Sequence, residues 1–144
     1  MAEMLIAGIL FATALVAVSR ISIASLISSS HLADRSRIEA DINDNIQAMQ
    51  KGDFYYTHAF ILNKGGEEAL QRACENPPKE LSNHLQGTVP QPRLTTITRS
   101  FDVNSAPGIL RVIYSFEGPE RQIQEEKRII EMTPNFAAMC YKTR

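Results

Sequence analysis

Residues 1–27, MAEMLIAGILFATALVAVSRISIASLI, decide how the rest of this chain must be arranged. Between residues 4 and 18 every position is apolar or Ala except Gly8 and Thr13, and no Pro or charge interrupts the run. One carboxylate, Glu3, comes before the run, and no Lys or Arg occurs before Arg20. The pattern predicts a helix that is apolar on every side and begins with an acidic residue.

This helix is long enough to cross a membrane. Residues 4–27 would extend over about 36 Å, and Arg20 would lie near the outer end, where its long side chain can reach the headgroups. A cleaved secretory signal is a weaker interpretation, because no basic region precedes the run and no convincing cleavage site follows it. A buried helix of a water-soluble protein is weaker still, because so small a chain cannot cover all sides of such a helix. We therefore expect a membrane-spanning segment.

The composition of the whole chain limits the other possibilities. The 144 residues include 15 basic and 16 acidic side chains, so the net charge of -1 gives no general attraction to nucleic acid or to an anionic surface. Cys74 and Cys140 are the two cysteines, and they do not form a CxxC motif. Such a pair favours one disulfide in an oxidising compartment, with two separate buried thiols as the alternative.

The helix is expected to continue beyond the membrane and to become amphipathic. No Pro occurs between residues 3 and 51, and no Gly between Gly8 and Gly52. In the second part, one helical face carries mostly apolar residues, while charged residues mostly occupy the other side. The residues of the apolar face are Ile38, Ile42, Asn45, Ile46 and Met49. We predict one helix over residues 3–51 that ends at Gly52, since Gly tolerates the backbone of a helix terminus.

The remaining residues predict a small antiparallel sheet. An apolar run (54–62) and a turn (63–66) precede a short helix (66–74), and a loop rich in Pro and Gly follows over residues 76–92. Strands are predicted over 94–103, 109–116 and 121–132, and their short connections favour a meander. One face of this sheet should cover the apolar face of residues 38–49. The predicted fold class is α+β.

The first 27 residues resemble the amino-terminal segment of type IV pilins and type II secretion pseudopilins. That family begins with a processed Phe-Thr-Leu-x-Glu motif followed by about twenty apolar residues, enough to span a bilayer. Glu3 takes the place of the family's glutamate, and Met1 and Ala2 take the two positions before it. The family's short basic leader would lie upstream of Met1. Arg20 stands where many major pilins have a helix-kinking Pro, which favours a minor pilin.

The resemblance implies a pilin-like fold, and beyond residue 27 the chain agrees with the family in architecture alone. Residues 1–27 would form the transmembrane and filament-core half of the helix, residues 28–52 its amphipathic half, and residues 53–144 a periplasmic head. The protein would be a single-pass inner-membrane subunit that enters a pilus or pseudopilus. Its partners would be other pilin or pseudopilin subunits and the inner-membrane assembly platform. The Glu3 carboxylate would pair with the positively charged amino terminus of a neighbouring subunit.

A different class of protein remains as the alternative: a signal-anchored, single-pass periplasmic protein whose head binds a ligand or partner without polymerising. The sequence offers little for catalysis under either interpretation. The three His residues are scattered without metal-ligand spacing, and no nucleophile or phosphate-binding motif occurs. We expect no enzymatic activity, no cofactor, no metal and no clear nucleic-acid site.

Overall fold

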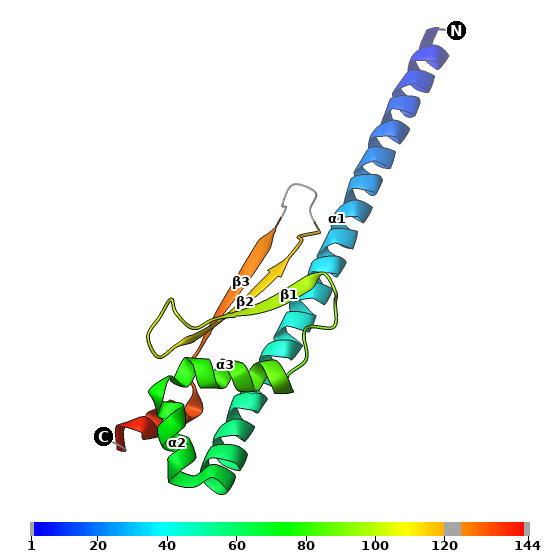
Figure 1. Cartoon of the computed structure of the whole chain (residues 1–144). Coiled ribbons are helices and arrows are strands. Elements are labelled where there is room, and N and C mark those ends of the chain that lie inside the picture. The colour runs from blue at the N-terminus through cyan, green and yellow to red at the C-terminus, as the bar shows by residue number, and fades with distance from the viewer. Residues whose placement is uncertain (1, 120–124, 143–144) are drawn as a thin grey trace. The chain divides into compact units, whose positions relative to one another are not determined.

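The computed structural model describes residues 2–119 and 125–142 (Figure 1). Side chains at 2–7, 9, 10, 12, 14 and 24 of the first helix, and at 141 and 142, lie outside the description. The elements in chain order are α1 (Ala2–Tyr55), the π-helix η1 (Tyr56–Gly65), α2 (Gly66–Glu75), α3 (Pro77–Thr88), β1 (Ile97–Asp102), β2 (Leu110–Phe116), β3 (Glu126–Met132) and the 3-10 helix η2 (Asn135–Lys142). Contacts between residues divide the chain into two compact units, Met1–Arg37 and Ile38–Arg144. We name the second the head unit.

The sheet of the head unit is the predicted antiparallel meander, with strand order β1-β2-β3. In its register Ser100 pairs with Ile113, and Ile113 pairs with Ile129. Side chains alternate along β2 between buried and partly exposed positions, which is the period of a strand with one covered face. Each strand is shorter than predicted, and residues 121–124 of the third predicted strand lie outside the described part. The α+β fold class is confirmed.

The core of the head unit contains side chains from the inner face of the sheet, the second part of α1 and the shorter helices. Ile42 and Met49 have no exposed surface, and Ile38 and Ile46 are half-buried against the same cluster. The prediction that these four side chains pack under the sheet is therefore confirmed. From β2, the buried Tyr114 places its hydroxyl 4.0 Å from the Met49 sulfur.

The predicted helix end at Gly52 is wrong. The α-helix continues to Tyr55, and helical backbone persists as a π-helix to Gly65, so the run at 54–62 is helical. Gly52 serves close packing: a Cβ atom there would lie 2.8 Å from Leu85 Cδ2 and 3.2 Å from Val89 Cγ2. The chain changes direction at Gly66, whose φ of 59° favours glycine.

The predicted loop over residues 76–92 is also wrong in its larger part, because α3 occupies Pro77–Thr88. Asn76 caps this helix, and its side-chain oxygen accepts a hydrogen bond from the Lys79 backbone N–H at 3.3 Å. The two prolines that suggested a loop occupy the first helical turn, where a missing N–H costs nothing. Leu81 and Leu85 are buried on the inner face of this helix.

Three carboxylates of α1 hold later parts of the head unit. Glu39 forms an ion pair with Arg128 of β3. Asp41 accepts hydrogen bonds from the backbone N–H groups of Arg93 and Leu94, at 3.2 and 2.9 Å. Asp53, which is buried, accepts the N–H of Asn135 at the start of η2. The helix thus contacts the sheet, the segment before it and the C-terminal helix.

Candidate functional site

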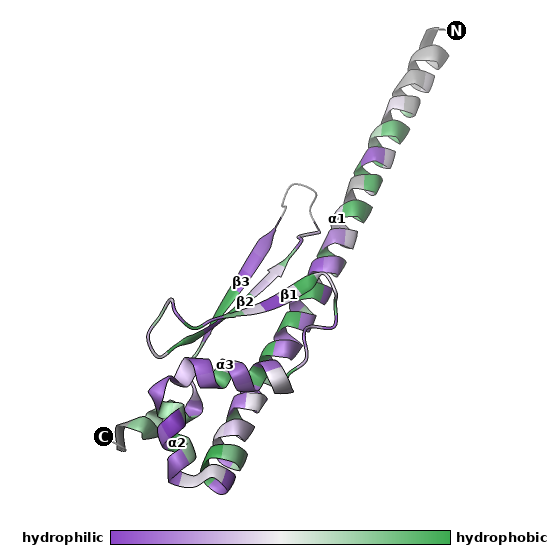
Figure 2. Ribbon diagram, in the orientation of Figure 1, coloured by the Kyte–Doolittle hydropathy of each residue, from purple (hydrophilic) through white to green (hydrophobic). Residues whose placement is uncertain are grey.

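The apolar part of α1 presents its side chains to the surroundings. The described chain contains one helical stretch long and apolar enough to span a membrane, and none of its most apolar window is buried. Large apolar side chains in the part of α1 before residue 38 are between 53 and 71% exposed. They are Phe11, Leu15, Val16, Val18, Ile21, Ile23, Leu26, Ile27 and Leu32. Figure 2 shows green, hydrophobic bands along this part of α1. A surface of this size needs lipid or other helices to cover it.

Polar side chains in this segment bond within the helix. The Ser19 hydroxyl donates to the Leu15 carbonyl at 2.9 Å, and the Ser22 hydroxyl donates to the Val18 carbonyl at 2.9 Å. Such bonds satisfy polar groups where water is absent. The serines are therefore compatible with an apolar environment.

Glu3, the predicted assembly residue, lies in the first turn of α1, but its side chain is outside the described part. Its backbone is helical and directly precedes the apolar run that begins at residue 4. Its role stays a prediction.

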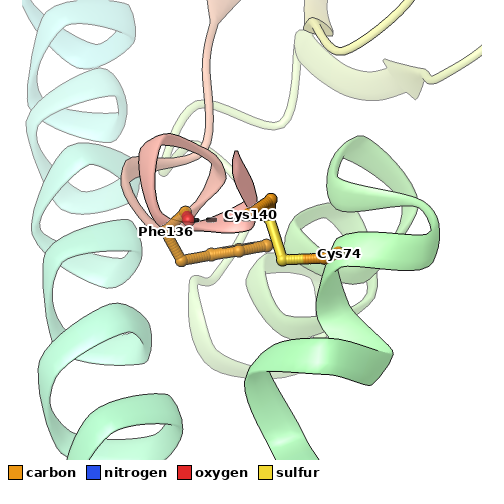
Figure 3. The surroundings of a disulfide bond; sticks show 3 residues. All are labelled: Cys74, Phe136 and Cys140. Carbon is orange, nitrogen blue, oxygen red and sulfur yellow. Dashed lines mark hydrogen bonds between the residues drawn. A yellow bond between two sulfur atoms is a disulfide. The ribbon is translucent and has the colours of Figure 1, made fainter. Parts of the chain in front are cut away.

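Cys74 and Cys140 are bonded, with 5.5 Å between their Cα atoms, inside the usual range for a disulfide. Figure 3 shows the bond joining α2 to η2. The Cys140 sulfur also lies 3.7 Å from the Phe136 carbonyl oxygen, and because a bonded sulfur carries no proton this is a packing contact. Within the described residues no group of three His, Cys, Asp or Glu side chains could hold a metal.

An open cleft of about 910 Å³ adjoins the disulfide. Its walls come from α2, the β1–β2 connection and the segment around η2, and include Glu75, Pro107, Thr133 and Asn135. This cleft could not be predicted from the sequence, because its walls come from three separated segments that only the folded chain brings together.

A buried arginine was also missed. Arg99 of β1 is only 5% exposed. Its guanidinium donates to Asn45 Oδ1 at 2.8 Å, to the Val89 carbonyl at 2.8 Å and to the Pro90 carbonyl at 3.1 Å. It also lies 5.1 Å from the centre of the Phe101 ring. Strand alternation could have found it, since Arg99 lies on the same face of the strand as the apolar Ile97 and Phe101.

The same Asn45 oxygen accepts a hydrogen bond from the Tyr114 hydroxyl at 3.0 Å. Burial raises the pKa of Tyr114 to about 12, and burial lowers the pKa of Arg99. Tyr114 is therefore protonated near neutral pH, as its role of hydrogen-bond donor to Asn45 requires. Asn45 joins α1 to both β1 and β2. This arrangement suits a structural role, holding the helix against the sheet, better than a role in proton transfer.

Burial also shifts the pKa values of Asp53 and His84. Burial raises the pKa of Asp53, although the hydrogen bond from the Asn135 backbone opposes the rise. Burial lowers the pKa of His84, whose ring stacks on Tyr56 with 4.3 Å between the centroids. No nucleophile with an adjacent base accompanies either group among the described residues, so neither forms a recognisable catalytic site.

No family model, curated protein or solved structure matches this chain. The feature of the described residues that points most directly to a function is the exposed apolar part of α1.

Proposed function

We propose that this protein is a minor pilin or pseudopilin, a structural subunit of a type IV pilus or type II secretion-like filament rather than an enzyme. In this proposal residues 1–27 insert in the inner membrane, with the amino end toward the cytoplasm. The head unit lies in the periplasm until the subunit is extracted. The subunit then joins other pilin or pseudopilin subunits through α1 with the help of the inner-membrane assembly platform.

One observation carries the proposal. A single helix, α1, combines an apolar part whose described large side chains are more than half exposed with a part that packs under an antiparallel meander. An anchor has to cross the bilayer once, whereas a filament subunit also needs a helix that neighbouring helices can surround after extraction. The disulfide between α2 and η2 agrees with an oxidising periplasm.

Glu3 gives this proposal its sharpest test. A carboxylate costs about 2.5–3.5 kcal/mol at the centre of a membrane helix and less near the interface. Pairing with the amino terminus of a neighbouring subunit would offset that cost. Glu3→Ala should therefore leave membrane insertion intact or slightly improved, and should lower entry into filaments, because the incoming amino terminus would be buried without a partner.

The measurement compares subunit in sheared filaments with subunit in the membrane for the wild type and for Glu3→Ala. Glu68→Ala, an exposed glutamate of the head unit, is the matched control and should partition like the wild type. Unchanged partitioning of Glu3→Ala would reject the assembly role. A smaller membrane pool would instead assign the carboxylate to insertion.

The cleft beside the disulfide favours a second candidate, a signal-anchored periplasmic protein that binds a ligand or partner through its head and never polymerises. Under this alternative, Glu3→Ala has no effect on filaments, and substitutions in the cleft walls abolish function. The sequence upstream of Met1 separates the two candidates at little cost. An in-frame basic stretch ending in Gly-Phe-Thr would support the pilin.

A further inference from the structure

The two edges of the sheet differ in how they are protected. On the outer edge of β1, the Gln91 side chain imitates a neighbouring strand: its Oε1 accepts the Arg99 N–H at 3.2 Å, and its Nε2 donates to the Arg99 carbonyl at 3.4 Å. The Ile97 N–H donates to the Leu94 carbonyl at 3.0 Å. This edge cannot accept another strand at those positions without losing these bonds.

The bonds of Arg99 also fix the direction of the other backbone groups. The backbone N–H and C=O of Arg99 point away from β2. Those of the next residue, Ser100, therefore point toward β2, where Ile113 is the partner. The residues of β2 that turn toward β3 are therefore the alternate ones, such as Val112, which pairs with Ile130. It follows that the backbone groups of 127, 129 and 131 point to the outer edge of β3. Within the described residues no backbone hydrogen bond occupies them.

The side chains at these three positions lie on the solvent face of the sheet. Lys127 and Glu131 are exposed, and Ile129 between them is 57% exposed. The neighbouring strand adds Ile113 beside Ile129, and Arg111 beside Glu131. The edge of β3 thus combines unpaired backbone groups with an apolar centre and one charge of each sign at its ends.

We propose that a second copy of this chain pairs with this edge, β3 against β3, antiparallel about a two-fold axis at Ile129. In that register each Lys127 lies opposite the second copy's Glu131, and the two Ile129 side chains lie opposite each other. All three facing positions have backbone groups that point to the edge, so the pairing forms the alternating hydrogen bonds of an antiparallel ladder. The two three-stranded sheets become one six-stranded sheet.

Charge complementarity selects this register and this partner. Opposite charges that face each other across strands stabilise pairing, and like charges destabilise it. Glu131 already accepts a hydrogen bond from Arg111 Nε at 2.9 Å, so the second copy's Lys127 would complete a row of three alternating charges. Lys127 now lies 3.8 Å from Glu125, with both side chains 57% exposed, which leaves its ammonium able to turn toward the partner. Shifting the register by two residues would separate the charges from their partners.

This contact is independent of the proposed filament function. A two-fold contact closes on itself and builds pairs, whereas a filament needs a head-to-tail contact. The pairing can therefore be present or absent whether or not the apolar part of α1 assembles a filament.

Cysteine cross-linking of the full chain in detergent micelles tests the pairing. Residues opposite each other in a hydrogen-bonded pair have Cα atoms about 5.5 Å apart, inside the range that a disulfide bridges. Ile129→Cys should therefore form a covalent dimer under mild oxidation. Ile113→Cys is the matched control on the next strand, where the two copies would be three strand spacings or about 14 Å apart, and it should stay monomeric. Equal cross-linking of both variants, or a monomeric Ile129→Cys, would overturn the proposal.

A charge exchange tests the register. Lys127→Glu and Glu131→Lys each place like charges opposite each other twice per dimer, so each variant alone should dimerise at least tenfold more weakly than the wild type. Mixing the two variants restores opposite charges at both positions and should restore association to within about threefold of the wild type. Sedimentation of each variant and of the mixture gives the dissociation constants. A mixture no tighter than its components would reject this register, and dimers unaffected by either charge reversal would reject β3 as the contact.

Discussion

The two parts of α1 have the same backbone and opposite surroundings. In the part before residue 38, Ile21 and Leu26 are 70 and 71% exposed, whereas in the part that follows Ile42 and Met49 have no exposed surface. Secondary structure does not distinguish the two parts, since both belong to the same continuous helix. The difference is that one face of the second part has a sheet to cover it, while none of the most apolar window of the first part is buried within the described residues. Substitutions at matched positions can separate what the folding of the head unit requires from what membrane insertion requires.

Introducing a carboxylate into each part should give the largest and most clearly opposed effects. Ile42→Asp buries a charge without a partner and should destabilise the head unit by several kcal/mol, enough to unfold it. Ile21→Asp, at a 70% exposed position, should leave the head unit folded but cost about 2.5–3.5 kcal/mol in membrane insertion. Limited proteolysis reports the folding of the head unit, and membrane fractionation reports insertion.

The two results have to dissociate for the comparison to hold. An unfolded head unit in Ile21→Asp would mean that the apolar part of α1 contributes to the stability of the head unit. Normal folding of Ile42→Asp would mean that the sheet does not cover this face.

Removing the disulfide should weaken the head unit without affecting the apolar part. The bond spans 66 residues, for which the loss of unfolded-chain entropy gives about 4 kcal/mol of stabilisation. The double variant Cys74→Ala/Cys140→Ala should lose most of this free energy of unfolding and keep wild-type membrane partition. Urea denaturation followed by tyrosine fluorescence measures the loss, because the chain contains no Trp. A loss below about 1 kcal/mol would show that the bond constrains the unfolded chain little.

Glycine substitution compares the two parts of α1 at smaller scale. Gly52→Ala places a methyl group 2.8 Å from Leu85 Cδ2, and the overpacking should outweigh the gain in helix propensity by about 1 kcal/mol. Gly8→Ala meets no atom within 4 Å, so only the propensity gain remains. The midpoint temperature of thermal unfolding should therefore fall for Gly52→Ala and stay unchanged or rise for Gly8→Ala. Equal shifts of both would remove the packing role assigned to Gly52.

The smallest expected effect is a pH dependence that belongs to the buried part alone. Burial raises the pKa of Asp53 above 3.8, so the folded protein binds a proton where the unfolded chain has already released it. The free energy of unfolding should fall as pH rises from about 4 through the folded pKa. Asp53→Asn should remove this fall, so its stability relative to the wild type should increase with pH. Asp44→Asn removes an exposed carboxylate of the same helix and is the matched control for the loss of one negative charge.

Much of this fold follows from periodicity. The apolar run at the start, the inward face at Ile42 and Met49, and the strand alternation around Val112 each depend on neighbours within a few residues, and each agrees with the structure. The wrong predictions concern residue types that occur in two structural contexts, Gly at helix ends or at close helix contacts, and Pro in loops or in first helical turns. Gly52 was interpreted as a helix end although it allows α3 to approach, and Pro77 as a loop residue although it begins that helix.

The candidate site was less accessible to sequence reasoning. The cysteine pair was predicted because only two cysteines exist. The cleft depends on walls that lie far apart in the chain, and the edge of β3 depends on hydrogen-bond directions that the sequence does not encode locally. The buried Arg99 contradicts the usual exposure of charged residues, and three acceptors from α1 and the segment before the sheet make its burial possible.

The carboxylates that α1 uses to hold the head unit have a consequence for biosynthesis. Glu39 emerges from the ribosome 89 residues before its partner Arg128, and Asp53 emerges 82 residues before Asn135. At typical elongation rates of about 5–20 residues per second, the inner face of the helix waits roughly 5–20 s for the strands that cover it. During that interval Ile42 and Met49 are as open to water, lipid or a chaperone as the segment before them. Folding of the head unit is therefore completed only after its last third has been translated.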